Sequence, residues 1–408
     1  MTRLAVPILR TSVLLFALAA TACKGEAPAH ASEAPAKPPT AAELQALAPA
    51  LRTYADIAQA AYADSASEAR KLLAAIDALA ASPGDATLAA TRKAWLAARH
   101  PYQQTEPLRF YDGPIDRTEL LINTWPIDEN FVEGAADSGA RGIVDDEQKY
   151  PELSAGLLSS LNAKDGETSI STGYHVIEFL LWGKDTNPDG PGARPAGDYD
   201  PKSSPLAERR ARYLRLSTEL LISELDELVQ AWAPDRADNY RSRFLAMPSL
   251  DAFALAVKGM GALSGPELAG ERLTVAYETK DQENEHSCFS DNTQQDLADN
   301  GLGLQNVCSG RYTRMDGSTL SGAGLCAAIA VRDRALGERL EREITASLTA
   351  LRAIPAPFDR ALAGNDETPS RKAVQSAIKA LTAQTATLAK VAARYDLKLS
   401  FPAAKGGP

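Results

Sequence analysis

The chain has 408 residues, with 53 Asp and Glu against 43 Lys and Arg, and a formal net charge of −10 at pH 7. Residues 1–22 hold two Arg and no acidic residue, so their removal would leave a mature charge of −12. This acidity argues against a nucleic-acid partner and is compatible with cation handling. The length exceeds that of one ordinary domain, so we expect two.

The N-terminus reads as an export signal. Arg3 and Arg10 precede a short apolar run, Val13–Ala20, and the segment ends at Cys23. The run is too short for a membrane span, and its ending resembles a bacterial lipoprotein signal. We therefore expect a signal peptide at 1–22, a lipidated Cys23 and a flexible tether over 23–40. The protein would cross the inner membrane and stay lipid-anchored to a membrane, facing the periplasm or the cell surface.

Helical periodicity dominates the mature chain. Apolar residues recur three and four apart from Leu44 to Leu79, from Leu206 to Leu228 and from Val374 to Tyr395. Such stripes predict amphipathic helices that each bury one face. No alternating strand pattern is evident, so the predicted class is all-α, with bundle-like packing.

Pro, Gly and polar residues mark the predicted breaks. They lie at Ser82–Asp85, at Lys184–Pro205 and around Pro355–Pro369. The second is long for a connection inside a compact domain. We therefore expect one helical bundle over 41–198 and a second over 199–402, with a site at or near their interface.

The stretch GYHVIEFLLWG at 173–183 is the most informative in the chain. His175 and Glu178 lie three apart, on one face of an otherwise apolar helix. A buried imidazole and carboxylate are costly unless they are paired, hydrogen-bonded or bound to a cation. We interpret them as metal ligands. The alternative is a structural pair in which His175 and Glu178 simply bond to each other.

Two further polar clusters could complete a metal site. The first choice is His286, which lies among acidic and hydroxyl residues that include Glu283, Ser290 and Asp291. The alternative for this cluster is a solvated helix end.

The second choice is Glu106, which sits with Arg109, Asp112 and Asp116 around a Gly-Pro pair. The alternative for this cluster is an ordinary turn with surface ion pairs. Trp182 ends the motif helix and is a weaker candidate, because core packing explains it equally well.

The sequence does not say which cysteines form a disulfide. Cys288, Cys308 and Cys326 remain beside Cys23, and none has the spacing of a zinc or redox motif. In an oxidising compartment one of the three pairs would bridge.

Several stretches together resemble the imelysin family (peptidase family M75), in particular its branch of iron-regulated, IrpA-like lipoproteins. They follow one another in the expected order and span most of the mature chain: AARHPYQQTEPLRFYDGPID at 97–116, INTWPIDENF at 122–131, the motif at 173–183, ENEHSCFSDNT at 283–293 and GRYTRMDG at 310–317. The resemblance implies two helical bundles with a site between them, an extracytoplasmic location and a link to iron uptake or iron regulation. It also implies that His175 and Glu178 form the metal signature of the family, and that an iron-transport component is a partner.

Three functions follow as hypotheses. The first is a lipoprotein that binds a metal ion, iron first and zinc as the alternative, since imidazole and carboxylate suit both. The second is a metallopeptidase, which the absence of H-E-x-x-H and H-x-x-E-H patterns disfavours. The third is a scaffold or ligand-binding lipoprotein whose His-Glu pair is structural. We expect binding rather than catalysis.

Overall fold

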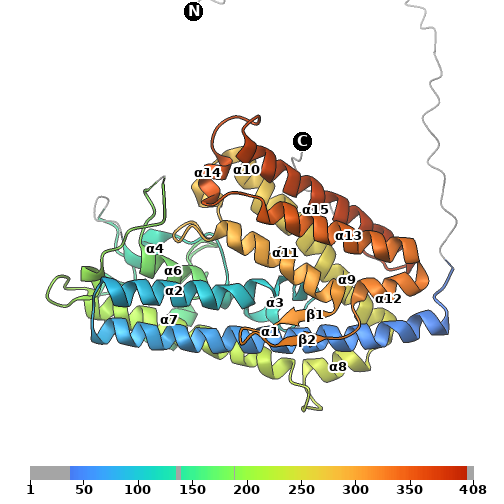
Figure 1. Ribbon diagram of the computed structural model, residues 1–408. Coiled ribbons are helices and arrows are strands. Elements are labelled where there is room, and N and C mark those ends of the chain that lie inside the picture. Colours follow the sequence, from blue (N-terminus) through green and yellow to red (C-terminus); the bar gives the residue numbers. More distant parts are fainter. Residues whose placement is uncertain (1–36, 135–138, 188, 402–408) are drawn as a thin grey trace, which may run out of the picture. The chain divides into compact units, whose positions relative to one another are not determined.

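Figure 1 shows the computed structural model, which describes residues 37–134, 139–187 and 189–401. By its internal contacts the chain divides into Met1–Lys37 and Pro38–Pro408, and the fold described below is that of the second unit. The predicted signal peptide, Cys23 and most of the tether lie outside the described residues.

The described residues are mostly helical, which confirms the predicted class. The longer helices are α1 (Ala41–Ala81), α2 (Asp85–Gln103), α7 (Ala207–Ala231), α9 (Ser249–Ala262), the π-helix η3 (Leu263–Thr274), α11 (Thr293–Ser309), α13 (Arg334–Arg352) and α15 (Pro369–Arg394). The shorter ones are α3 (Ile115–Ile122), α4 (Glu129–Glu133), α5 (Ala155–Leu161), α6 (Tyr174–Trp182), α8 (Tyr240–Ala246), α10 (Val275–Thr279), α12 (Leu325–Arg332), α14 (Phe358–Leu362) and the 3-10 turns η1 (Glu106–Leu108), η2 (Ala196–Tyr199) and η4 (Gln282–Asn284).

The longest helix, α1, shows how the sequence determines where a helix begins, which face it buries and where it ends. Thr40 caps its start: the Thr40 hydroxyl accepts the backbone N–H of Glu43, and the Glu43 carboxylate accepts the backbone N–H of Thr40. The stripe that includes Leu47, Leu51 and Tyr54 is buried. The helix ends at Ala81, where the break predicted at 82–85 begins.

The helices pack in two groups that touch each other. In Figure 1, α1 runs beside α2 and α7, while α13 runs beside α11 and α15. Both α9 and α12 contact α1 as well. Although α7 follows the expected boundary at residue 199, it packs against α1, which precedes that boundary. The division of the chain into two bundles at residue 199 stays a prediction.

A short β-hairpin was not expected from the sequence. Strands β1 (Arg311–Thr313) and β2 (Thr319–Ser321) pair antiparallel, and three residues are too few to show alternation. The carboxylate of Asp64 in α1 accepts the Tyr312 hydroxyl at 3.0 Å and the backbone N–H of Met315 at 3.1 Å. This buried carboxylate therefore fastens the hairpin to α1.

The disulfide lies at the base of the same hairpin. Cys308 and Cys326 are bonded, while Cys288 is a buried free thiol. This selects one of the three pairings that the sequence left open.

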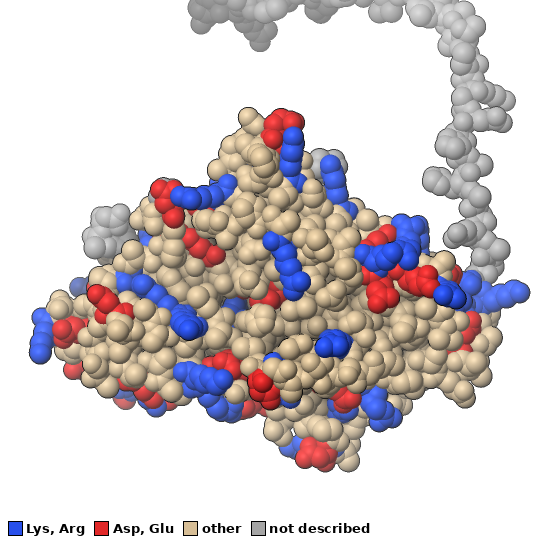
Figure 2. All heavy atoms as spheres, in the orientation of Figure 1, with Lys and Arg blue, Asp and Glu red and all other residues tan. Residues whose placement is uncertain are grey.

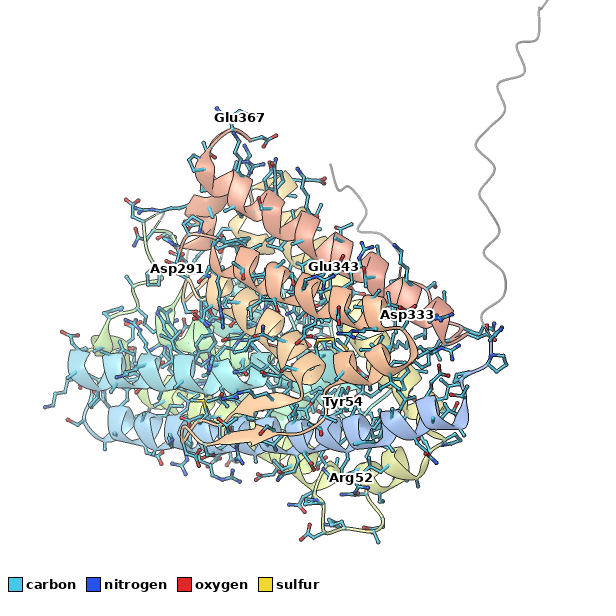
Figure 3. All side chains as sticks on the ribbon, turned by 45° about the vertical axis from the view of Figure 1, so that its right-hand side comes forward. Arg52, Tyr54, Asp291, Asp333, Glu343 and Glu367 are labelled. Atoms are coloured by element: carbon cyan, nitrogen blue, oxygen red, sulfur yellow. A yellow bond between two sulfur atoms is a disulfide. The ribbon has the colours of Figure 1, made fainter. Side chains whose placement is uncertain are left out.

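Side chains fill the space between the helices (Figure 3). On the face shown in Figure 2, acidic and basic residues are interspersed. Among the described residues, no single helix is long and apolar enough to cross a membrane. One sharply bent pair, Tyr240–Ala246 with Ser249–Thr279, meets the length and composition of a span.

Candidate functional site

The helix α6 carries the motif, and a glycine with positive φ stands at each end. Gly173 has φ 92° and Gly183 has φ 73°, conformations that glycine adopts without the steric cost of a Cβ. A Cβ on Gly173 would lie 2.5 Å from the carbonyl oxygen of Ile122. The start of α6 thus fits closely against the end of α3, and all nine residues of α6 are buried.

His175 and Glu178 face each other, as their spacing predicts. Nδ1 of His175 lies 3.0 Å from Oε2 of Glu178, and both side chains are buried. Oε1 of Glu178 accepts the backbone N–H of Ser290 at 2.9 Å and its hydroxyl at 2.6 Å. Ser290, a predicted site residue from the loop before α11, therefore belongs to the same buried network.

The guanidinium of Arg99, in α2, lies at the centre of this network. Its Nη2 is 3.3 Å from Nε2 of His175 and 3.3 Å from Nδ1 of His286. Nε and Nη2 donate to Oδ2 of Asp296 at 3.0 and 2.9 Å, and Nη1 donates to Oδ1 of Asn123. The structure thus brings His175, Glu178 and His286 together, but around an arginine.

Arg99 also fixes the proton on His175. A guanidinium has only donors, so Nε2 of His175 must accept from it. The imidazole proton therefore lies on Nδ1 and is donated to Oε2 of Glu178. Each polar atom of the pair then has a protein partner.

The pKa values of the network follow from burial. Burial lowers the pKa of His175 and His286 well below its usual value, and the charges of Arg99 at His175 and of Arg272 at His286 add to this. Burial raises the pKa of Glu178 to about 8, against the hydrogen bonds from Ser290. Both imidazoles are therefore neutral at pH 7.

A pocket of about 340 Å³ opens beside this network. His286 lies on its wall, which is shared between α3 and η3 and the turns that follow α3 and α10. Helices of the π type are rare and are frequent at functional sites. The charged side chains on the wall are Arg109, Arg272, Glu119, Glu267, Glu271 and Glu283.

Glu106, the second-choice ligand, serves as an ion-pair acceptor behind the same pocket. Its Oε2 accepts Nη1 of Arg109 and Nη2 of Arg272, each at 2.8 Å. Burial alone would raise the pKa of Glu106, but the two guanidiniums overcome it and lower the pKa to about 2. The structure therefore places Glu106 and Arg109 with the pocket rather than with the His175–Glu178 pair.

The remaining predicted residues lie in different settings. The Asp116 carboxylate accepts backbone N–H groups of Phe110, Tyr111 and Gly113 and so shapes the turn, in which Asp112 is exposed. Trp182 packs edge-to-face on Trp95, with ring centroids 5.3 Å apart.

Asp291 lies just before α11 (Figure 3). Burial, together with the charges of Asp359 and Asp185, raises its pKa to about 7. Glu283 is exposed on the wall of the pocket.

Sequence reasoning missed the residues at the centre of the site, Arg99 and Asp296. One signal was present: Trp95, Arg99 and Tyr102 are spaced four and three apart, so they share one face of α2. All three are fully buried. An arginine on an aromatic stripe of this kind indicates a buried guanidinium.

The predicted metal ligands are engaged with other side chains of the protein. Within residues 37–134, 139–187 and 189–401, no group of three or more His, Cys, Asp or Glu side chains is arranged to hold a metal ion. The ring nitrogens of His175 face Glu178 and Arg99, and Glu106 faces two arginines. A metal ion at His175 would have to displace Arg99 in this arrangement, and metal binding by His175 and Glu178 stays a prediction.

Comparison with known proteins places the chain in a family. The model of the imelysin family, Peptidase_M75, matches residues 58–388. Iron-regulated protein A from Synechococcus elongatus (strain ATCC 33912 / PCC 7942 / FACHB-805) is 26% identical over 337 residues, which is 80% of this chain and 79% of that protein.

Two crystal structures share the fold. One, of an iron-regulated protein A precursor from Parabacteroides distasonis ATCC 8503, has a TM-score of 0.66 at 21% identity and covers 88% of this chain and 96% of its own. An imelysin-like protein from Psychrobacter arcticum 273-4 has a TM-score of 0.60 at 14% identity and covers 90% of this chain and 100% of its own. The family match over most of the chain confirms the resemblance seen in the sequence: this chain belongs to the imelysin family and is similar to iron-regulated protein A.

Proposed function

We propose that this protein is an extracytoplasmic, lipid-anchored binding protein of iron handling. Its cargo would be iron carried by a small, oxygen-rich chelator, bound in the pocket beside His286. The observation that carries the proposal is that both acidic and basic side chains line that pocket. The His175–Glu178 pair beside it already has protein partners for its polar atoms. The names of the relatives, which describe iron regulation, support the link to iron.

The size of the pocket favours a complex over a bare ion. Small-molecule sites occupy roughly 300–1,000 Å³, and this pocket measures about 340 Å³. A single ion would leave most of that volume to water.

The side chains on the pocket wall favour a ligand that combines positive charge with hydrogen-bond acceptors. Glu119 and Glu267 are ion-paired with Arg109 and Arg272, at 3.1 and 2.8 Å, and Glu106 is paired with both arginines. Glu271 and Glu283 also line the pocket, so its carboxylates outnumber its guanidiniums. The excess of carboxylate attracts positive charge. A metal centre supplies that charge.

Two buried hydrogen-bond donors in the same wall lack an acceptor within the described part of the chain. Nε1 of Trp125 and Nε of Arg109 are buried and have no hydrogen-bond partner among the described residues. Buried donors of this kind are normally satisfied. The oxygen atoms of a chelator would satisfy them after a small shift of the wall.

Calorimetric titration of the mature chain tests the proposal. The cationic 1:2 complex of ferric ion with acetohydroxamate is expected to bind, and acetohydroxamate alone to bind at least tenfold more weakly. Glu271→Gln with Glu283→Gln removes two exposed pocket carboxylates and should weaken the ferric complex about tenfold, or about 1.4 kcal/mol. Glu208→Gln with Glu278→Gln changes the net charge equally outside the pocket and should have no effect.

Two results would contradict the proposal. One is a failure of the ferric acetohydroxamate complex to bind at all. The other is equal binding by the pocket variant and its matched control.

A second candidate is capture of a bare ion by the network itself. Nε2 of His175, Nδ1 of His286 and Oδ2 of Asp296 all lie within 3.3 Å of Nη2 of Arg99. Two imidazoles and a carboxylate are a ligand set that suits ferrous iron. Binding there would require Arg99 to leave, and loss of ferrous ion affinity in His175→Ala would support it.

A further inference from the structure

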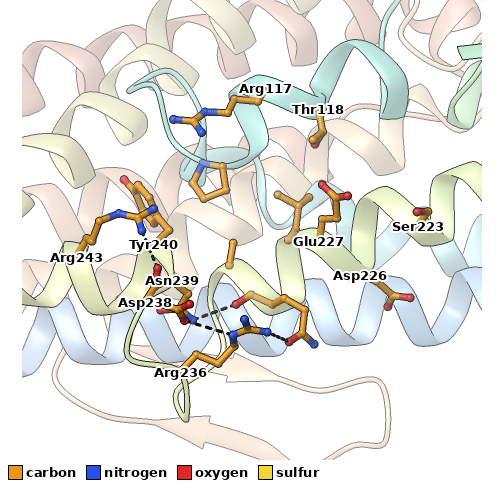
Figure 4. Close-up of a pocket in the computed structure, with 14 residues that line it drawn as sticks. Arg117, Thr118, Ser223, Asp226, Glu227, Arg236, Asp238, Asn239, Tyr240 and Arg243 are labelled. Atoms are coloured by element: carbon orange, nitrogen blue, oxygen red, sulfur yellow. Dashed lines mark hydrogen bonds and ion pairs between the residues drawn. The ribbon is translucent and has the colours of Figure 1, made fainter. Parts of the chain in front are cut away.

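A second cavity, larger than the pocket beside His286, lies on another part of the protein. It measures about 630 Å³ and is formed by α3, the C-terminal part of α7 and α8 (Figure 4). This volume suits a small organic molecule. Pro114, Leu228 and Ala231 give it apolar walls between its charged groups.

Some of the charged side chains in the cavity are paired within the protein. Arg236 lies 3.7 Å from the Asp238 carboxylate and donates to Gln230 at 3.3 Å. Asp226 accepts from Arg70, which lies outside the cavity, at 2.7 Å. The charges of Arg236, Asp238 and Asp226 are therefore paired within the protein.

Three charged side chains in the cavity have no charged partner among the described residues. The side chains of Arg117 and Glu227 make no hydrogen bond or ion pair within the part of the chain that the structure describes. Arg243 donates at 2.9 Å to the backbone carbonyl of Asp238, which carries no charge. Two guanidiniums and one carboxylate, from three different helices, are therefore available inside one cavity.

The Tyr240 hydroxyl adds an uncharged hydrogen-bond donor on the side of the cavity that holds Arg117 and Arg243. Burial and the charge of Asp116 raise its pKa to about 12, and the charges of Arg243 and Arg117 act against that rise. The phenol is therefore protonated at neutral pH, and its ring is held by stacking on Phe244. Thr118 also faces the cavity, with a buried hydroxyl that has no partner among the described residues.

We propose that this cavity binds a small zwitterion. The oxyanion of the ligand lies between Arg117 and Arg243 and accepts from the Tyr240 hydroxyl, and an ammonium group lies at Glu227. Guanidinium pairs recognise carboxylate and phosphate through charge-assisted hydrogen bonds. Short peptides and phosphoethanolamine groups share this chemistry.

The test is calorimetric titration of the mature chain with dialanine and with phosphoethanolamine. At least one should bind, and the tighter of the two identifies the oxyanion. Arg117→Gln with Arg243→Gln should weaken each zwitterion that binds the parent at least tenfold. Glu227→Gln should weaken dialanine but leave N-acetyl-dialanine, which lacks the ammonium, unchanged.

Matched variants outside the cavity provide the controls. Arg212→Gln with Arg334→Gln removes two exposed guanidiniums, and Glu208→Gln removes an exposed carboxylate of α7; both should bind like the parent. All these residues are on the surface, and unchanged circular dichroism confirms that the variants fold. Failure of both zwitterions to bind at millimolar concentration would overturn the proposal, as would parental affinity in the cavity variants.

Discussion

Nη2 of Arg99 lies 3.3 Å from Nε2 of His175, at the position from which a metal ion would draw the lone pair of that nitrogen. Both side chains are almost completely excluded from solvent. The cation beside the family motif is therefore a side chain of the protein. This relationship makes Arg99 the residue whose removal has the clearest consequences.

Replacing Arg99 by Met should strongly destabilise the fold. The change leaves the carboxylate of Asp296 buried without its partner, and breaking a buried ion pair in this way costs about 3–5 kcal/mol. Urea denaturation measures the loss. Arg334→Gln, which breaks an exposed pair with Glu338, should cost no more than about 1 kcal/mol. Equal midpoints for the two variants would show that Arg99 is not the centre of the network.

Glu178 should make stability depend on pH. Its folded pKa of about 8 lies above the ordinary value of 4.5, so the folded state holds more protons than the unfolded state between these values. The corresponding stabilisation is complete below pH 4.5 and is lost as the pH rises through 8. In Glu178→Gln the contribution of Glu178 should disappear and leave a shallower dependence, since burial also raises the pKa of Glu285, to about 9; Glu208→Gln should keep the parental curve. Parallel curves of unfolding free energy against pH for Glu178→Gln and the parent would contradict the assignment.

The disulfide should stabilise the region around the hairpin. Cys308 and Cys326 are 18 residues apart, and closing a loop of about that length contributes roughly 3 kcal/mol. The double variant Cys308→Ala, Cys326→Ala should lose a similar amount in urea denaturation. Reductant should then change the stability of the parent but not of the variant. Cys288→Ala keeps the bridge and should remain sensitive to reductant.

Asp64 should hold the hairpin against α1. Asp64→Asn keeps the size of the side chain but weakens its bonds to Tyr312 and Arg314, since hydrogen bonds to charged groups contribute about 1.5–3 kcal/mol. Hydrogen exchange should accelerate at the amide of Met315, which donates to Asp64. An unchanged exchange rate there would show that the hairpin is held by other contacts.

The sequence predicts much of the helical fold and one half of the site. Stripes of apolar residues located α1, α7 and α15, and the spacing of His175 and Glu178 placed them on one buried face. Periodicity works here because each of these helices buries only one side.

The other half of the site depends on contacts between distant segments. Arg99 and Asp296 are 197 residues apart, and no local pattern says that they meet. The ordinary expectation for arginine is a position at the surface. The hairpin escaped prediction for a related reason: its position depends on Asp64, which lies about 250 residues earlier in the chain.

The most direct test compares zinc and ferrous ion binding by the apo-protein and by its Arg99→Ala variant. If Arg99 occupies the place of the ion, the parent binds neither ion at His175, and Arg99→Ala gains one site. That site should be lost again on adding His175→Ala. Stoichiometric binding by the parent that His175→Ala abolishes would contradict the account, because His175 would then be a ligand despite Arg99.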